Sequence, residues 1–249
     1  MDLTRKMSVD ILSAFDINND RLPLIIDKYI RKYDVPFSQK KRIKATVNEI
    51  IRYRGLIDYI IEKSSSKKMR NIKPKLKSIL RLGCYELLFD EIIPEFAAIH
   101  SSVELGKNLM NKKSGSMVNA VLRNMQRKQD SDPSWLETIK RNNIELSFPN
   151  WLVNKWRKQF GETNTKKLCK SHTKKPPMFL RVDTNQLSLE KTIRILNQSA
   201  IEVECYEIFN SFLKVSAGQE KVFDDDLFKC GIISIQDPAS AAVAEMLKP

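Results

Sequence analysis

Glycine is scarce and widely scattered in this sequence. Its seven glycines are never closer together than nine residues, so the chain has no Gly-rich turn of the kind that lets a backbone approach a nucleotide cofactor. Four cysteines are also far apart: Cys84, Cys169, Cys205 and Cys230. Their spacing fits neither a CxxC metal site nor a dense disulfide framework. We therefore expect no cofactor or metal in this chain, and free thiols.

A long hydrophobic run is missing as well. No apolar segment approaches the roughly 20 residues that a membrane-spanning helix requires. The first residues, MDLTRKMSVDILSAF, lack the apolar core and small-residue cleavage site of a secretory signal. We expect a soluble, cytoplasmic protein that has no membrane partner.

Positive charge is what the chain has in excess. It holds 43 Lys and Arg against 30 Asp and Glu, a net charge of +13, which is typical of proteins with an anionic partner such as nucleic acid. Residues 40–81 contain fourteen basic residues against three acidic ones, and residues 131–181 contain eleven against four. Residues 182–249 are acidic, with six basic residues against eleven. The basic footprint therefore belongs to the first two thirds of the chain.

Residues 1–130 carry the periodicity of amphipathic helices, almost without strand signals. The apolar positions from Ile43 to Ile61 mark one long helix, which Gly55 weakens. In the next helix one apolar face is formed by Leu76, Ile79 or Leu80, Gly83 and Leu87. We predict an all-α bundle of five to seven helices.

The second half of the chain changes character at residue 176. Before it, three helices are predicted: Trp135–Asn143, Pro149–Phe160 and Glu162–Ser171. After it, four strands alternate with a helix at 189–196 and a short helix or turn at 222–228: 178–182, 203–206, 212–215 and 232–235. The order β-α-β-β-α-β predicts a small ferredoxin-like sheet. We expect an α+β chain with three parts: an all-α domain at 1–130, a helical linker at 131–175 and a small α+β subdomain at 176–249.

The last stretch, Gly231–Pro249, leads from a strand into an Ala-rich helix. Asp237 before Pro238 is a good N-cap, because proline suits the first helical position. Val243, Met246 and Leu247 should give the helix an apolar face for a partner that the chain lacks. We therefore expect this stretch to lead up to a further domain.

An ordered set of motifs in residues 80–127 carries a resemblance. It consists of Tyr85-Glu86-Leu87-Leu88, a connection at Pro94, Val103-Glu104-Leu105 and Val118-Asn119-Ala120-Val121-Leu122-Arg123. This set resembles the NusB domain of the transcription antitermination factor and of bacterial rRNA methyltransferases. That domain binds RNA, so the resemblance implies RNA as the partner of the basic segment.

Three further motifs point to one branch of these proteins: Phe148-Pro149-Asn150-Trp151-Leu152, Met178-Phe179-Leu180-Arg181-Val182 and Gln236-Asp237-Pro238-Ala239-Ser240. They resemble the segment before the catalytic domain in the Sun (Fmu) family of rRNA 5-methylcytosine methyltransferases. The resemblance implies S-adenosylmethionine as the cofactor of the full-length parent, and small-subunit rRNA as its substrate. In that family the two catalytic cysteines follow Pro and Thr, whereas here the four follow Gly, Leu, Glu and Lys. We expect this chain to be inactive by itself.

Two hypotheses for function follow. In the first, the chain is the RNA-binding N-terminal portion of such a methyltransferase, present here as an expressed fragment, a product of a frameshift or a natural short relative. The alternative is a stand-alone NusB-type RNA-binding protein that acts in transcription antitermination or ribosome assembly. An in-frame continuation of the gene, with a Gly-rich loop and Pro-Cys and Thr-Cys motifs, would favour the first.

Lysines and arginines are the candidate RNA-binding residues. Lys73, Lys77 and Arg81 follow at four-residue steps and predict a basic stripe on one helix face. Other candidates lie in the preceding loop, in an earlier helix and at a strand: Lys67, Lys68, Arg70, Lys40, Lys41, Arg42, Lys44 and Arg181. A solvated face is the alternative for the cluster, and contact with the absent domain is the alternative for Arg181. Three tryptophans, Trp135, Trp151 and Trp156, could stack on bases, but helix packing is the favoured interpretation.

Overall fold

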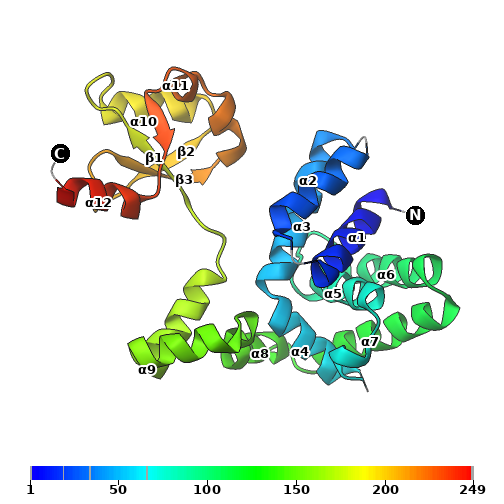
Figure 1. Cartoon of the computed structure of the whole chain (residues 1–249). Coiled ribbons are helices and arrows are strands. Elements are labelled where there is room, and N and C mark those ends of the chain that lie inside the picture. Colours follow the sequence, from blue (N-terminus) through cyan, green and yellow to red (C-terminus); the bar gives the residue numbers. More distant parts are fainter. Residues whose placement is uncertain (1, 19, 34, 66, 248–249) are drawn as a thin grey trace. The chain divides into compact units, whose positions relative to one another are not determined.

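The structure, a computed structural model, describes residues 2–18, 20–33, 35–65 and 67–247 (Figure 1). The chain divides into two compact units, Met1–Thr173 and Lys174–Pro249, and each has a hydrophobic core of its own. Within the described ranges, no helix is both long and apolar enough to span a bilayer.

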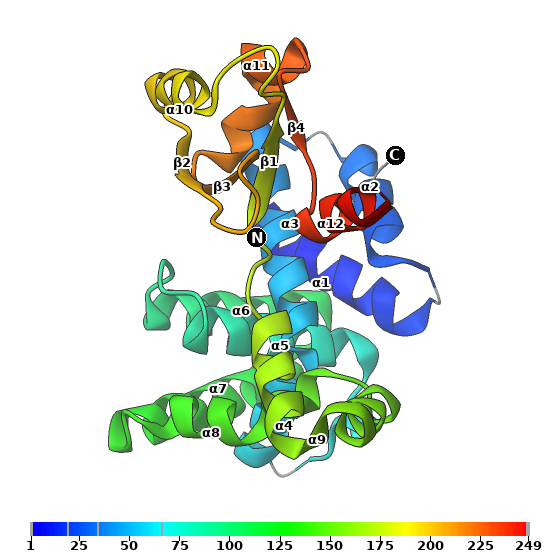
Figure 2. The same cartoon turned by 90° about the vertical axis from the view of Figure 1, so that its left-hand side faces the viewer.

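In the described residues of the first unit, every regular element is a helix. Its elements are α1 (Leu3–Ile17), α2 (Leu22–Lys32), α3 (Phe37–Arg52), α4 (Arg54–Ser64), η1 (Met69–Asn71), α5 (Pro74–Leu88), α6 (Glu95–Leu109), α7 (Lys112–Ser131), α8 (Trp135–Asn143), η2 (Ile144–Ser147) and α9 (Asn150–His172). Helix α5 lies inside the bundle and contacts α1, α4, α6 and α7, as Figures 1 and 2 show. The predicted all-α bundle is confirmed.

The helix predicted around Gly55 is wrong, because two helices replace it. Tyr53 has non-helical backbone angles, φ −101° and ψ 12°, and separates α3 from α4. Gly55 then faces the backbone of η2, where an added Cβ would lie 1.6 Å from the carbonyl oxygen of Leu146. The glycine is therefore needed for close packing. Periodicity alone could not reveal this approach, because the two segments are far apart in sequence.

Residues 135–173 pack onto the helical bundle. Element η2 contacts α4, α8 and α9, and the Tyr53 hydroxyl donates a hydrogen bond to the carbonyl oxygen of Thr173 at 3.1 Å. Gly161, with φ 74° and ψ 170°, interrupts α9. The prediction of two helices that meet between Phe160 and Glu162 is confirmed, since only glycine adopts such a conformation readily.

The second unit is a small sheet with short helices. Its elements are β1 (Met178–Val182), α10 (Leu189–Gln198), β2 (Glu202–Cys205), β3 (Phe212–Ala217), η3 (Gln219–Asp224), α11 (Asp226–Lys229), β4 (Ile233–Ile235) and α12 (Pro238–Leu247). The strands form one sheet in the order β2-β3-β1-β4, with antiparallel neighbours throughout. The predicted β-α-β-β-α-β order and ferredoxin-like sheet are confirmed.

Alternation along the strands separates the two faces of this sheet. Leu180, Leu213 and Val215 are buried and join residues of α10 and α11 in the core. Arg181 and Lys214, their neighbours in sequence, are exposed on the other side. One face therefore holds the core, whereas the opposite face carries Arg181 and Lys214 together with the buried ring of Phe212.

Helix α12 has the N-cap that its sequence predicts. The Asp237 carboxylate accepts a hydrogen bond from the Ala239 backbone N–H at 2.7 Å. Val243, Met246 and Leu247 are 59%, 84% and 74% exposed, so the predicted apolar surface is present. The last two residues of the predicted stretch, Lys248 and Pro249, lie outside the described residues.

Candidate nucleic-acid interface

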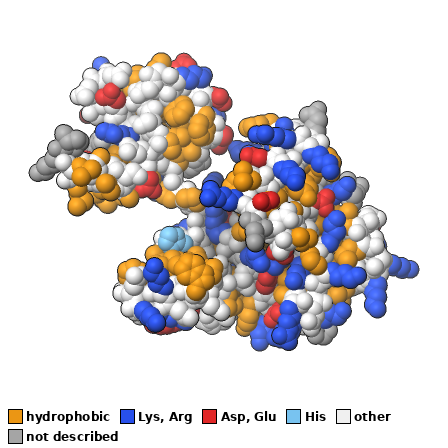
Figure 3. All heavy atoms as spheres, viewed as in Figure 1, with side chains coloured by type: hydrophobic (Ala, Val, Ile, Leu, Met, Phe, Trp, Pro, Cys, Tyr) orange, Lys and Arg blue, Asp and Glu red, His pale blue; other side chains and the backbone are white. Residues whose placement is uncertain are grey.

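Basic side chains are spread over the helical unit (Figure 3). On α3, Lys41, Arg42 and Lys44 are exposed and Lys40 is half-buried. The Lys44 ammonium lies 3.4 Å from a carboxylate oxygen of Asp27. These four predicted RNA-binding residues can all meet solvent, but their close sequence spacing distributes them around the helix.

Arg81 does not belong to the exposed basic stripe that the sequence predicted. Lys73 is exposed and Lys77 is half-buried, but Arg81 is only 2% exposed. Its guanidinium donates hydrogen bonds to both carboxylate oxygens of Asp58, at 2.7 and 2.8 Å, and to Asp16 at 2.6 Å. Arg81 therefore holds α1, α4 and α5 together, and the prediction that places it on an exposed face is wrong.

Helix geometry explains the position of Arg81. With 3.6 residues per turn, two four-residue steps rotate a side chain by about 80° around the axis. Because of this rotation, Lys73 faces solvent whereas Arg81 faces α1 and α4. Burial lowers the pKa of Arg81, but hydrogen bonds and charge from Asp58 and then Asp16 outweigh it, so the pKa is raised overall. The guanidinium stays charged.

Other members of the basic segment also have carboxylate partners. Arg54 lies 3.4 Å from Asp16, and Lys75 lies 3.1 Å from Asp10. The charge count of the segment therefore overstates the positive charge that an external anion can meet. The acidic partners come from α1, outside the segment in which the charge was counted.

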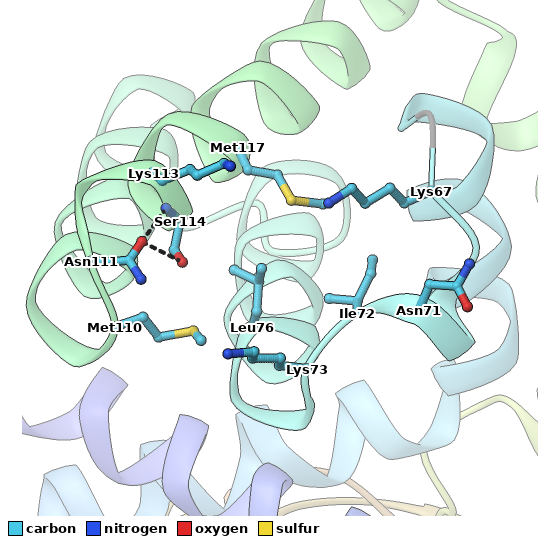
Figure 4. Close-up of a pocket in the computed structure, with 10 residues that line it drawn as sticks. All are labelled: Lys67, Asn71, Ile72, Lys73, Leu76, Met110, Asn111, Lys113, Ser114 and Met117. Carbon is cyan, nitrogen blue, oxygen red and sulfur yellow. Dashed lines mark hydrogen bonds between the residues drawn. The ribbon is translucent and has the colours of Figure 1, made fainter.

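Three lysines without an ion pair among the described residues surround one pocket. The pocket measures about 470 Å³, and the residues that line it are Lys67, Asn71, Ile72, Lys73, Leu76, Met110, Asn111, Lys113, Ser114 and Met117. Lys67 and Lys113 extend toward Met117 from opposite sides, and Lys73 lies on the side of Met110 (Figure 4). None of the lining residues is an Asp or Glu. Positive charge at this pocket is therefore not neutralised by its own walls.

Local hydrogen bonds hold the segment that carries Lys67. The Glu62 carboxylate accepts a hydrogen bond from the Met69 backbone N–H at 2.7 Å and lies 3.4 Å from the Lys68 ammonium. These contacts, led by the Met69 N–H, lower the pKa of Glu62. Arg70 is exposed next to them. Residues 68–69 are thus held by a carboxylate near the end of α4.

Two helices begin at the pocket. Helix α5 starts at Pro74 after Lys73, without a side-chain cap. Helix α7 starts after Asn111, whose Oδ1 accepts from the backbone N–H and the hydroxyl of Ser114, at 2.9 and 3.1 Å. Helix N-termini carry partial positive charge and favour anions. Both ends add to the field of the three lysines.

The sequence predicted no role in RNA binding for Lys113, Asn111 or Ser114. The signal was present, because Asn111 is a capping residue followed by two lysines in the first turn of a helix. What the sequence does not contain is the packing of α7 against α5 and α6. This packing brings Lys113 to the pocket that Lys67 and Lys73 approach from about 40 residues earlier in the chain.

Arg181 lies in the other unit, on β1. Its guanidinium is exposed and donates a long hydrogen bond, 3.4 Å, to the side-chain oxygen of Gln236. It lines a pocket of about 400 Å³ that also includes Asp183. Asp183 accepts from Gln186, and this bond is the main cause of its lowered pKa. The carboxylate beside Arg181 reduces its value as an isolated phosphate contact.

The described residues do not fit S-adenosylmethionine. Open sheets that bind nucleotide cofactors do so at the carboxyl ends of parallel strands, next to a Gly-rich turn. The sheet here is antiparallel throughout, and its two flanking glycines, Gly218 and Gly231, lie far apart in the chain.

Comparison with protein families assigns both parts of the chain. The family model of the NusB family matches residues 2–127, the region that forms the helical bundle and the lysine-lined pocket. The chain belongs to the NusB family. A second model, "Methyltr_RsmF/B-like, ferredoxin-like domain", matches residues 148–220. This NusB family member therefore joins its bundle to a domain that is found with methyltransferases. The first part of the second match, residues 148–173, belongs to the helical unit.

Two curated relatives resemble nearly the whole chain. "Probable ribosomal RNA small subunit methyltransferase B" of Bacillus subtilis is 30% identical over 251 residues, which cover 98% of this chain and 54% of the relative. The protein with the same description in Synechocystis sp. is 23% identical, with 98% and 55% covered. The chain spans about half the length of these curated relatives.

One solved structure has the same fold along the entire chain. The crystal structure of PH0851 superposes with a TM-score of 0.57 at 18% identity, and the match covers 100% of this chain and 56% of the other. At this identity the likeness concerns the fold alone.

Proposed function

We propose that this chain is the RNA-binding portion of an S-adenosylmethionine-dependent 5-methylcytosine methyltransferase that acts on small-subunit rRNA. The observation that carries the proposal is the pocket of Lys67, Lys73 and Lys113, which has no carboxylate in its walls. Cofactor binding and methyl transfer belong to the part of the relatives that this chain does not span.

The three lysines suit a phosphate backbone. They come from three segments, the loop before η1, the start of α5 and the start of α7, so their ammonium groups can meet successive phosphates rather than one ion. Lysine contacts of this kind supply affinity and orientation without reading sequence. We therefore assign to the bundle the task of holding rRNA, whereas selection of the target base lies elsewhere.

The second family match favours this function over a stand-alone NusB-type protein. Residues 148–220 match a domain associated with methyltransferases, and the first two curated relatives are described as methyltransferases of small-subunit rRNA. A chain whose only role was antitermination would have no use for that second domain.

The test is the salt dependence of RNA binding. Lys67→Ala, Lys73→Ala and Lys113→Ala are combined in one variant, and its affinity for small-subunit rRNA transcribed in vitro is measured at a series of salt concentrations. Each lost phosphate contact flattens the plot of log K against log salt by about 0.7 to 0.9, so the triple variant should lose about two to three units of slope.

A charge-matched variant provides the control. Lys191→Ala, Lys221→Ala and Lys229→Ala remove the same charge from exposed positions of the acidic second unit, and the slope should stay close to that of the original protein. If both triple variants lose slope equally, the effect is net charge and the pocket is not the site. If the original protein fails to bind the rRNA, the proposed function is wrong.

A further inference from the structure

We propose that Trp151 on α9 is a stacking platform for an unpaired RNA base, with Lys155 and Lys158 contacting the phosphates beside that base. This inference rests on the proposed function, because it adds a second RNA contact to the lysine-lined pocket. It concerns a different element and a different kind of contact.

Trp151 differs from the other two tryptophans in its surroundings. Trp135 packs against the core of the bundle, with the Lys128 ammonium 5.8 Å from its ring centre. Trp156 stacks on His172 at 5.6 Å and meets Phe148 at 5.5 Å. Trp151 is 68% exposed, and no ring or cation among the described residues covers it. Helix packing, which the sequence favoured for all three, therefore accounts for two of them.

The position of Trp151 is well supported by its neighbours. It lies in the first turn of α9, which follows Pro149 as the N-cap residue and which Val153, 4% exposed, anchors to the unit. Phe148, just before the helix, contacts Trp156 one turn further on. A ring on such a support loses little freedom when it binds, which favours stacking over a flexible aromatic.

Basic residues share the face of Trp151. Lys155 and Lys158 follow it by four and seven residues, the spacing that places side chains on one side of a helix. Both are exposed, and neither has an ion pair within the described part of the chain. Arg157, on another face, is neutralised by Glu145 and Glu162 at 2.6 and 3.0 Å. The free cations of this turn are thus the ones beside the exposed ring.

The positive charge of α9 favours RNA over an apolar protein surface as the partner of Trp151. Residues 150–172 hold six Lys and Arg against a single Glu, and Figure 3 shows hydrophobic and basic side chains together over α9. An apolar protein partner would have to bury these ammonium groups, whereas RNA supplies phosphates for them and a base for the ring. The aromatic pair Phe179 and Tyr206 on the sheet is a weaker candidate for base stacking. The two rings already contact each other, with their centres 4.9 Å apart, and they lie in an acidic unit.

The test compares short unstructured RNA with the same backbone lacking bases. A fluorescein-labelled oligouridylate and an abasic oligomer of equal length are titrated with the 249-residue chain and with Trp151→Ala and Trp151→Phe. Loss of one stacked base should weaken oligouridylate binding about tenfold or more, and Trp151→Phe should keep most of the affinity. Binding of the abasic oligomer should be the same for all three proteins.

Phe160→Ala is the matched control, since Phe160 is a 50% exposed aromatic on α9 nine residues from Trp151, and its loss should leave oligouridylate binding unchanged. The inference is overturned if Trp151→Ala binds oligouridylate as the original protein does, or if it loses abasic binding equally. If rRNA binding still depends on Lys67, Lys73 and Lys113, the proposed function survives that result. If the original protein binds neither rRNA nor oligouridylate, the proposed function fails as well.

Discussion

At the scale of single residues, Arg81 shows how far charge in the sequence differs from charge at the surface. It belongs to the most basic segment of the chain, but it is enclosed by two carboxylates from α1 and α4. Each of the three charged groups depends on the others, because a charge left buried without its partner loses hydration that nothing replaces. Arg81 is therefore a structural residue.

We expect Arg81→Ala to destabilise the helical unit by about 3 to 5 kcal/mol, the cost of leaving one partner of a buried ion pair alone. The free energy of unfolding from urea denaturation measures this. Lys73→Ala, at an exposed position of the same helix, should change stability by less than about 0.5 kcal/mol. Equal stability of the two variants would mean that the Arg81 network contributes nothing.

The thiols give a second prediction at this scale. Cys84 and Cys169 are fully buried, whereas Cys205 and Cys230 are exposed, and burial raises the pKa of both enclosed thiols. Because the thiolate is the reactive form, a chromogenic disulfide reagent should modify two cysteines rapidly in the native protein and all four in denaturant. A Cys205→Ser, Cys230→Ser variant should show no rapid phase; a rapid phase in that variant would contradict the assigned burial.

At the scale of elements, close backbone contacts decide where helices break and meet. The turn at Tyr53 and the approach of η2 to Gly55 divide what periodicity presents as one helix. The same contact ties residues 144–147 to α4. A segment that resembles a linker in sequence is therefore part of the bundle in structure.

Two explanations for Gly55 predict opposite changes in stability for Gly55→Ala. If Gly55 only weakened a helix, alanine would stabilise the protein by about 1 kcal/mol. Because its Cβ would overlap the Leu146 carbonyl oxygen, we expect a loss of about 1 to 3 kcal/mol, typical of overpacking. Thermal and urea unfolding measure the difference. Asn119→Ala, at an exposed position of α7, should be neutral or slightly stabilising.

At the scale of the whole molecule, two separate cores define the chain. Residues 174–177 join the units and contain no helix or strand, and Lys174 and Lys175 are exposed there. Charge also divides along this boundary, since the helical unit is basic and residues 182–249 are acidic. RNA contacts are therefore expected mainly in the first unit.

Limited digestion with trypsin tests the exposure of this connection. The first cut should fall between Lys174 and Lys175, because exposed irregular backbone is cleaved before helices and the Lys175–Pro176 bond resists trypsin. Mass spectrometry of early products should show fragments that end at Lys174 and begin at Lys175. In Lys174→Gln this cut should disappear. An earlier cut within α9 would show that the helix opens more readily than the connection.

The sequence by itself determined most elements of this protein and their order, the division between α3 and α4 excepted. Alternation and helical periodicity located β1 and α8 to the residue, since these patterns depend on neighbours a few positions apart. Motif order in the sequence also predicted the family that the comparisons established.

Only the tertiary structure decided which basic and aromatic side chains are left exposed. Burial of Arg81, exposure of Trp151 and the arrival of Lys113 beside Lys67 and Lys73 all depend on helices that are distant in sequence. The physical reason is that an ion pair or a covered ring requires contact within a few ångströms, and the folded chain alone sets which distant carboxylate or ring supplies it. Net charge could predict an anionic partner, but it could not distinguish a cation held by Asp16 and Asp58 from one left free for phosphate.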